Sequence, residues 1–251
     1  MPAGRAVTAP GGMELQIVLP GALPDREPCA PVDRIAAVPL VVRGVAARPD
    51  LIAIGASAEG PAGVALGRRG EALGLIAGPP RSGRTSALLA IAAALAERPV
   101  CWVSPDASVC LPSGLFRAGS TAETSAWLAA KPAGVVLVDD ASGLLDTDLE
   151  DLLVDFAARA STSGAVVFAA GDPGDLAATY RGLVGELRRR GTGLLLTPNR
   201  TDGELFGVRC PKLDRPRPGN GYLVQRGELT EVQVALVDDP VRPDEPDQRV
   251  A

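Results

Sequence analysis

The segment LGLIAGPPRSGRTSALL, residues 73–89, sets the interpretation of the whole chain. It contains Gly78, four further residues and then Gly83-Arg84-Thr85, which matches the phosphate-loop pattern G-x-x-x-x-G-K-[ST] with arginine in the lysine position. An apolar run at 73–77 predicts a buried strand before the loop, and the run at 85–97 predicts a helix after it. A strand, a glycine-rich loop and a helix in this order are the setting in which the pattern binds phosphate.

The chemistry of this loop suits a nucleotide. Backbone N–H groups between two glycines can surround phosphate oxygens, and the positive end of the helix dipole lies at the same place. The predicted nucleotide-binding residues are Gly78, Pro79, Pro80, Arg81, Ser82, Gly83, Arg84, Thr85 and Ser86. Thr85 would place its hydroxyl on Mg²⁺. The alternative is that Pro79, Pro80 and Gly83 only form a strand-to-helix turn.

The second half of the site is predicted after the apolar run at 135–138. Asp139 follows this run, where a hydrolysing phosphate-loop domain holds its magnesium, so Thr85 and Asp139 are the predicted Mg²⁺ ligands. Asp140 is the catalytic candidate, because the next residue often activates water, although glutamate is usual there. The shorter aspartate sets the base back, and a misplacement near 1 Å can cost ~100-fold in rate. The alternative for Asp139 and Asp140 is a helix N-cap or a solvated turn.

Two other positions argue against rapid hydrolysis. Arg84 carries the positive charge of the usual lysine, but a planar guanidinium is not a compact ammonium. At the end of the run at 165–169, where motor ATPases often place a polar sensor of the γ-phosphate, Ala170 and Gly171 have no side chain that can hydrogen-bond. We therefore expect nucleotide binding without fast turnover.

Composition excludes several functional classes. The 251 residues are enough for one large α/β domain, and the absence of histidine removes histidine-based catalysis and metal binding. A net charge of −5 gives no basic excess of the kind seen in an isolated DNA-binding domain. The four cysteines have no C-x-x-C spacing and fit a reduced, cytosolic setting. No run is apolar and long enough to span a bilayer, and the N-terminus is not a signal peptide.

Strands and helices alternate along the chain, which predicts an α/β fold with a mostly parallel sheet and helices on both faces. The helix after the phosphate loop is apolar on almost every side, so it must be covered all round. Ser120 and Glu123 form a capping box. Strands are expected at 73–77, 100–103, 135–138, 165–169 and 193–197, helices at 85–97, 120–130, 148–160 and 176–190, and a C-terminal hairpin at 222–224 and 231–236.

Three segments are expected from the composition. Residues 1–50 form a disordered start, a short strand at 13–19 and a proline-rich connector; residues 51–237 form the nucleotide-binding domain; residues 238–251 form a disordered acidic tail. The strand MELQIVL near the start is similar to TEVQVAL at 230–236, which suggests the last strand of a preceding copy of the domain. The alternative is two ordinary amphipathic strands.

Several motifs together resemble one family. The segments are IAIGASAEGPAGVAL, GPPRSGRTSALL, VVLVDDAS, VVFAAGDP, LLLTPNRTDGELFGVRCP, RPRPGNGYLV and VQVAL, spread over residues 51–236. They are similar to ATPase domains of the FtsK/SpoIIIE type, especially the degenerate last domain of type VII secretion chains of the EccC/EssC kind. The resemblance places the phosphate loop at 78–86 and the magnesium strand at Asp139. The chain departs from the family at Arg84, Asp140, Ala170-Gly171 and at Asn220, where arginine is usual.

The resemblance implies a RecA-like fold that binds ATP and Mg²⁺ and associates with tandem ATPase domains or ring neighbours. Through such an assembly, DNA or a secreted protein would be the substrate, and the domain would be cytoplasmic and membrane-associated without inserting itself. Three hypotheses follow. The chain is a regulatory nucleotide-binding module, a working motor that moves DNA or protein, or a scaffold with an empty site.

Overall fold

The computed structural model describes residues 5–7, 14–16, 38–39, 41–43, 50–105, 109, 111–213 and 216–237. By its internal contacts the chain divides into two units, Met1–Ile35 and Ala36–Ala251. In the first, β1 (Arg5–Val7) pairs antiparallel with β2 (Glu14–Gln16). Strand β2 lies inside the strand expected at 13–19, whereas the sequence pattern does not predict β1. The expected tail at 238–251 and most of the expected connector lie outside the described residues.

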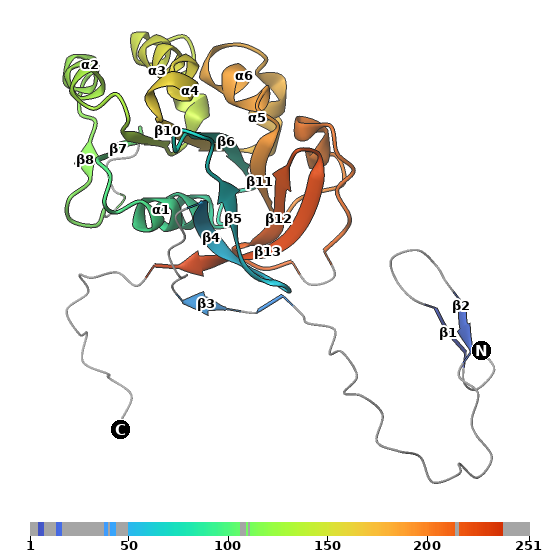
Figure 1. The fold of residues 1–251 in the computed structure, drawn as a ribbon. Coiled ribbons are helices and arrows are strands. Elements are labelled where there is room, and N and C mark those ends of the chain that lie inside the picture. The colour runs from blue at the N-terminus through green and yellow to red at the C-terminus, as the bar shows by residue number, and fades with distance from the viewer. Residues whose placement is uncertain are drawn as a thin grey trace, which may run out of the picture. The chain divides into compact units, whose positions relative to one another are not determined.

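The second unit is built on one sheet with the strand order β5-β4-β13-β12-β11-β6-β10-β9-β7-β8 (Figure 1). From β11 to β8 every neighbouring pair is parallel, and from β11 to β5 every pair is antiparallel. The parallel half contains β6 (Ala72–Ala77), β7 (Val100–Val103), β8 (Phe116–Arg117), β9 (Val135–Val138), β10 (Val166–Gly171) and β11 (Thr192–Leu196). The antiparallel half contains β4 (Leu51–Ser57), β5 (Gly60–Ala65), β12 (Asn220–Gln225) and β13 (Glu228–Leu236).

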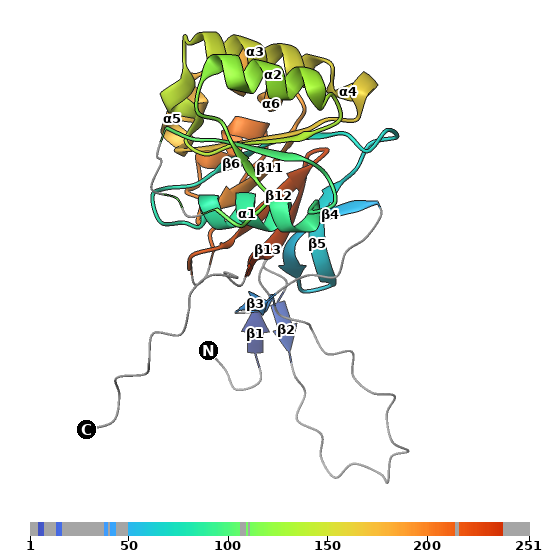
Figure 2. The same ribbon diagram turned by 90° about the vertical axis from the view of Figure 1, so that its left-hand side faces the viewer.

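Helices cover both faces of the sheet, as the sequence predicts. One face carries α2 (Thr121–Ala130), α3 (Asp148–Ala158), α4 (Ala160–Ser163), α5 (Pro173–Ala178) and α6 (Gly182–Arg188), as Figure 2 shows. The other face carries α1 (Arg84–Ala94). Alternate strand residues point to the two faces, so the strands contribute to two separate apolar clusters.

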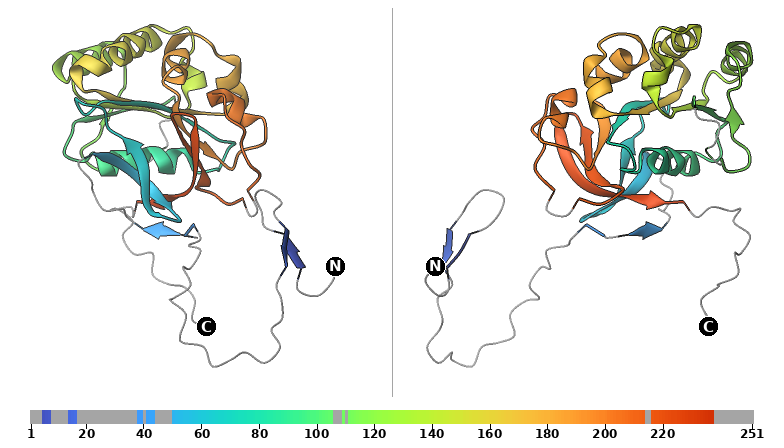
Figure 3. Two further views of the ribbon diagram at one scale, coloured as in Figure 1. Left: turned by 45° about the vertical axis from the view of Figure 1, so that its right-hand side comes forward. Right: turned by 180° about the vertical axis from the view of Figure 1, so that it is seen from behind.

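Helix α1 is enclosed between the two halves of the sheet. It contacts β6, β9 and β10 of the parallel half and also β4 and β13 of the antiparallel half, which curls around it (Figure 3). Ala87, Leu88 and Ile91 are completely buried, and Ala90 and Ala92 are nearly so. The structure thus explains why this helix lacks a polar face, since a one-sided cover would leave half of its apolar surface in water.

Most elements agree with the sequence-based expectations within two or three residues. The strands at 100–103 and 135–138 match to the residue, and β12 and β13 form the expected C-terminal hairpin. At the start of α2 the Ser120 hydroxyl accepts a hydrogen bond from the Glu123 N–H (3.2 Å), which confirms the cap. The expectation of one helix at 176–190 is wrong. The chain forms two short helices there, α5 and α6, which are separated by residues 179–181.

We expect Ile91→Ala to lower the free energy of unfolding by about 2–5 kcal/mol, because it leaves a cavity between two layers that cannot both collapse onto it. Urea denaturation followed by circular dichroism measures this loss. Leu145→Ala, at a side chain that is 38% exposed, is the matched control and should change stability by less than about 1 kcal/mol. Equal effects of the two substitutions would contradict the enclosure of α1.

Candidate functional site

The predicted phosphate loop connects β6 to α1 and is held by backbone hydrogen bonds. The Gly78 N–H donates to the Gly171 carbonyl at the end of β10 (3.2 Å), and the Ser82 N–H donates to the Pro79 carbonyl (3.2 Å). Gly83 precedes α1 with φ 102°, a left-handed conformation that strongly favours glycine. The loop therefore begins on one parallel strand, closes on itself and enters the helix at Gly83.

Tight packing fixes the path of the loop. A Cβ atom on Gly78 would overlap Ser82 Oγ, and one on Gly83 would lie 3.1 Å from the Gly219 nitrogen. Ser82 is 3% exposed, and its hydroxyl has no hydrogen-bond partner among the described residues. A buried polar atom without a protein partner calls for a ligand, a water or an ion, and a phosphate oxygen would satisfy it here.

The structure brings together the two predicted magnesium ligands. Thr85 Oγ1 donates a hydrogen bond to Asp139 Oδ2 at 2.9 Å, across 54 positions of sequence. The two residues meet because Thr85 lies in the first turn of α1 and Asp139 directly follows β9, at the carboxyl edge of the parallel strands. Asp139 is 8% exposed. A hydroxyl beside a carboxylate at the foot of a phosphate loop is an oxygen-ligand pair suited to Mg²⁺ when phosphate oxygens complete the coordination.

The loop is electropositive. Arg81 is exposed with φ 65°, and Arg84 is half-buried with no hydrogen bond or ion pair to any described residue. The first turn of α1 has no acidic side chain, so its unsatisfied N–H groups and dipole add to the positive potential. Ser86, the last predicted binding residue, lies in this turn.

The positions expected to weaken catalysis have local structural partners. Asp140 is exposed with φ 62°, and its Oδ1 accepts a hydrogen bond from the Ser142 hydroxyl (2.8 Å). Ala170 is buried, and the Gly171 carbonyl accepts the Gly78 N–H. Asn220 is 1% exposed and donates through Nδ2 to the Val232 carbonyl (3.2 Å) and to Glu231 Oε1 (3.3 Å).

The described cysteines supply no nucleophile to this site. Burial raises the pKa of the Cys101 thiol to about 12. Burial, with a smaller contribution from Asp202, raises the pKa of Cys210 to about 11. Both thiols therefore stay protonated near neutral pH.

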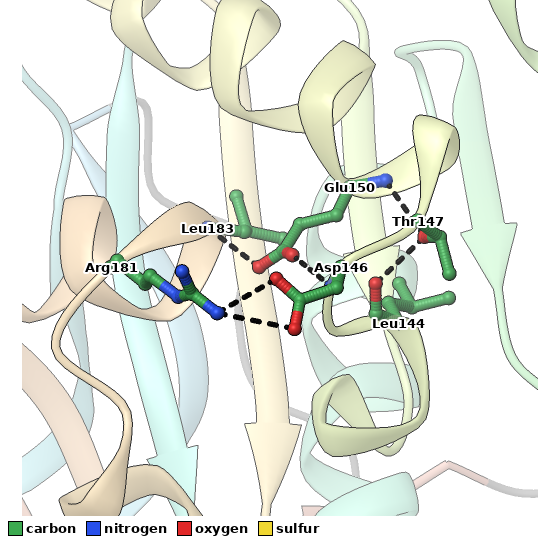
Figure 4. Close-up of polar contacts among 6 residues, drawn as sticks. All are labelled: Leu144, Asp146, Thr147, Glu150, Arg181 and Leu183. Carbon is green, nitrogen blue, oxygen red and sulfur yellow. Dashed lines mark hydrogen bonds and ion pairs between the residues drawn. The ribbon is translucent and has the colours of Figure 1, made fainter.

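A feature missed by the sequence analysis is a carboxylate that joins α3 to α6. Glu150 is 6% exposed; its Oε1 accepts the Leu183 N–H (3.1 Å) and its Oε2 accepts the Asp146 N–H (2.9 Å), as Figure 4 shows. Thr147 caps α3 by accepting the Glu150 N–H (3.2 Å). The sequence Thr147-x-x-Glu150 has capping-box spacing, which signals the cap but not the bond to Leu183.

A cavity of about 760 Å³ lies beside this connection. Its wall includes the exposed Tyr180 and the exposed ion pair of Arg181 with Asp146 (3.0 Å). Both carboxylate oxygens of Glu150 are already used by backbone donors, while Asp148 and Asp151 lie in the first turn of α3, where the dipole favours negative charge. The polar groups of this cavity are thus accounted for by the local fold.

Replacing Glu150 tests this connection. We expect Glu150→Ala to lower the free energy of unfolding by about 2–4 kcal/mol, because it leaves two backbone donors without acceptors. Glu150→Gln keeps one carbonyl acceptor and should lose less, whereas Asp155→Ala on the exposed side of α3 should stay within about 0.5 kcal/mol. Urea unfolding curves measure the free energy of unfolding of all three variants. A Glu150→Ala variant as stable as wild-type protein would contradict the role of Glu150 in joining α3 to α6.

Neither a family model nor a curated protein matches the sequence, but solved structures do. EssC ATPases 2 and 3 from Geobacillus thermodenitrificans match with a TM-score of 0.61 and 19% identity over 79% of this chain and 43% of that one. Thermomonospora curvata EccC ATPases 2 and 3, in complex with a signal sequence peptide, match with a TM-score of 0.59 and 18% identity over 79% of this chain and 44% of that one. The pCW3 conjugation coupling protein TcpA with ATPγS matches with a TM-score of 0.61 and 13% identity over 81% of this chain and 72% of that one.

These similarities show the fold, a mixed α/β fold with a mostly parallel sheet and antiparallel hairpins that matches structures of P-loop ATPases. The chain spans less than half the length of the EssC and EccC chains that it matches. Within the described part of the chain, no helix has the length and apolarity to cross a membrane. The same part holds no cluster of three or more acidic or cysteine side chains that could hold a metal ion.

Proposed function

We propose that the chain is an ATP-binding domain of the FtsK/SpoIIIE type with weakened catalytic positions, acting as a regulatory or structural module of a translocase or secretion ATPase. The hydrogen bond between Thr85 and Asp139 is the observation that carries the proposal. It joins the phosphate loop to a carboxylate from a different strand, and a simple strand-to-helix turn would not need such a partner.

Each part of the site has a distinct role in binding. The backbone N–H groups of Arg81 and of residues 83–86 cradle the phosphates, and the Ser82 hydroxyl gains an acceptor or donor that it lacks in the described structure. Arg84 supplies positive charge as a planar fork. Mg²⁺, held by Thr85 and Asp139, would neutralise charge on the phosphate oxygens.

The neighbouring groups support slow hydrolysis. Asp140 is held in a tight local turn by Ser142, so its carboxylate is drawn away from the role of a general base. Ala170 and Gly171 offer no side-chain hydrogen bond to a γ-phosphate, and Asn220 is committed to β13. Because catalysis depends on groups placed to favour the transition state, a site that keeps its binding loop and lacks these groups binds without rapid turnover.

The partners follow from the shared fold and remain part of the proposal. EssC and EccC contain several ATPase domains, and one EccC structure holds a signal sequence peptide. This chain would likewise act with tandem ATPase domains or ring neighbours, and DNA or a secreted protein would engage the assembly. The domain would work on the cytoplasmic side and reach the membrane only through that assembly.

ATP binding gives the first test. A ligand that binds only the folded state stabilises it by about 2.7 kcal/mol at about 100 times its Kd, so ATP with Mg²⁺ should raise the melting temperature of the full chain by several degrees. Arg84→Ala should weaken this shift, Arg84→Lys should retain it, and Arg209→Ala, at an exposed arginine, should leave it unchanged. If ATP with Mg²⁺ leaves the melting temperature of wild-type protein unchanged, ATP binding is rejected and the empty scaffold is favoured.

Turnover separates the regulatory module from a working motor. We expect phosphate release far slower than about 1 s⁻¹, the low end of ordinary enzymes, and a rise in the double variant Arg84→Lys/Asp140→Glu because both changes restore the usual groups. A phosphate-release assay with and without DNA, over a range of protein concentrations, measures this. Rapid wild-type turnover under any of these conditions would show a motor instead.

A further inference from the structure

The phosphate loop is held from outside by the turn at Arg217–Asn220. The turn closes on itself through the Asn220 N–H, which donates to the Arg217 carbonyl (3.0 Å). Its third residue, Gly219, donates its N–H to the Ser82 carbonyl at 2.7 Å, a short backbone hydrogen bond. This is a tertiary contact, since the two residues lie on segments far apart in the sequence.

The bond to Gly219 fixes the direction of the next N–H in the loop. In a trans peptide the carbonyl and the following N–H point to opposite sides of the chain. With the Ser82 carbonyl directed to Gly219, the Gly83 N–H points away from the turn and is left available to a ligand of the loop. Releasing the carbonyl would free this peptide to rotate and would remove one aligned donor from the loop.

Gln233 of β13 holds the turn in place. Its Nε2 donates to the Pro218 carbonyl (3.1 Å), and the adjacent Val234 N–H donates to the Gly219 carbonyl (2.8 Å). Gln233 is 5% exposed, so both ends of its amide need partners. Gly219 has φ 77°, and a Cβ atom there would lie 2.6 Å from Gln233 Nε2, so the turn admits only glycine at this contact.

Arg217 connects this arrangement to the segment that leads into the domain. Its Nε donates to Gln233 Oε1 (3.0 Å), and its Nη2 donates to the Pro39 carbonyl (3.1 Å). The same segment continues as β3 (Val42–Arg43), which pairs in parallel with Ala235 and Leu236 of β13. One guanidinium thus bridges Pro39 and the Gln233 amide that positions the turn.

We infer that Arg217, through Gln233 and the turn at Gly219, is a positioning residue of the phosphate loop and couples nucleotide binding to the docking of Pro39 and β3. A nucleotide that orders the Ser82-Gly83 peptide would tighten the turn and the Arg217 bridge, and a docked segment would in return raise the affinity for nucleotide, because coupling between two sites is reciprocal. The inference rests on the proposed function for its ligand. The hydrogen-bonded link from Pro39 through Arg217, Gln233 and Gly219 to Ser82 exists without a bound ligand.

Hydrogen–deuterium exchange on the full chain tests the link. In wild-type protein, ATP with Mg²⁺ should slow exchange in residues 41–43 as well as in 82–85. Arg217→Ala should speed exchange in both regions without nucleotide, weaken ATP binding roughly fivefold, the low end of ordinary coupling, and abolish the response of 41–43 to ATP. The exposed Arg209→Ala is the matched control and should change none of these.

Gln233→Glu separates the two halves of the link. A carboxylate still accepts from Arg217 but cannot donate to Pro218, so residues 41–43 should stay protected while exchange at 82–85 rises and the response to ATP disappears. Arg217→Lys, with a single ammonium in place of a fork, serves if Arg217→Ala does not fold, and should loosen both regions.

The outcomes distinguish the link from the proposed function. If the variants speed exchange at 41–43 but leave exchange at 82–85 and the ATP Kd unchanged, Arg217 only anchors the segment and the inference is overturned. If wild-type protein binds no ATP, the proposed function fails, and exchange at 82–85 in the nucleotide-free variants still decides whether the link exists.

Discussion

The enclosure of helix α1 is the constraint on which the rest of the structure depends. From Ala87 to Ala94 this helix has no polar side chain, so it is stable only if both halves of the sheet bury it. The parallel strands cover one side, and the antiparallel strands β4 and β13 curl over the other. Because the phosphate loop runs directly into this helix, the packing that buries Ile91 also fixes where Gly83 and Thr85 lie. The packing of the apolar core therefore also sets the geometry of the candidate site.

The site itself is made mainly of backbone groups held by other backbone groups. The Gly171 carbonyl holds the start of the loop and the Gly219 N–H holds its end, while side chains contribute the pair of Thr85 and Asp139. Such a frame keeps its shape when catalytic side chains are replaced. On the proposed function, such a frame allows the chain to keep a phosphate-binding loop while Asp140, Ala170 and Asn220 stand where active relatives are expected to have other side chains.

Buried polar side chains in this fold join elements that the apolar core alone would leave loosely oriented. Glu150 links the N-terminal ends of α3 and α6, and Gln233 links β13 to the turn beside the loop. Each is almost fully buried with its polar atoms paired, and each sets a direction that non-directional apolar packing cannot set. The position of the phosphate loop thus depends on residues well outside its own motif.

The sequence by itself determined the α/β class, the strand, glycine-rich loop and helix around residues 73–94, the buried strands at 100–103 and 135–138, the hairpin and the cap at Ser120, because periodicity, glycine spacing and capping are local signals. It also placed Thr85 and Asp139 at the ends of separate elements. Only the tertiary structure decided that Thr85 and Asp139 touch and that β10 lies between β6, which precedes the loop, and β9, which precedes Asp139. It also decided that the helix expected at 176–190 breaks before Leu183, whose N–H donates to Glu150. These outcomes depend on hydrogen bonds between residues tens of positions apart, and no local pattern of residue types encodes which distant partner a donor will meet.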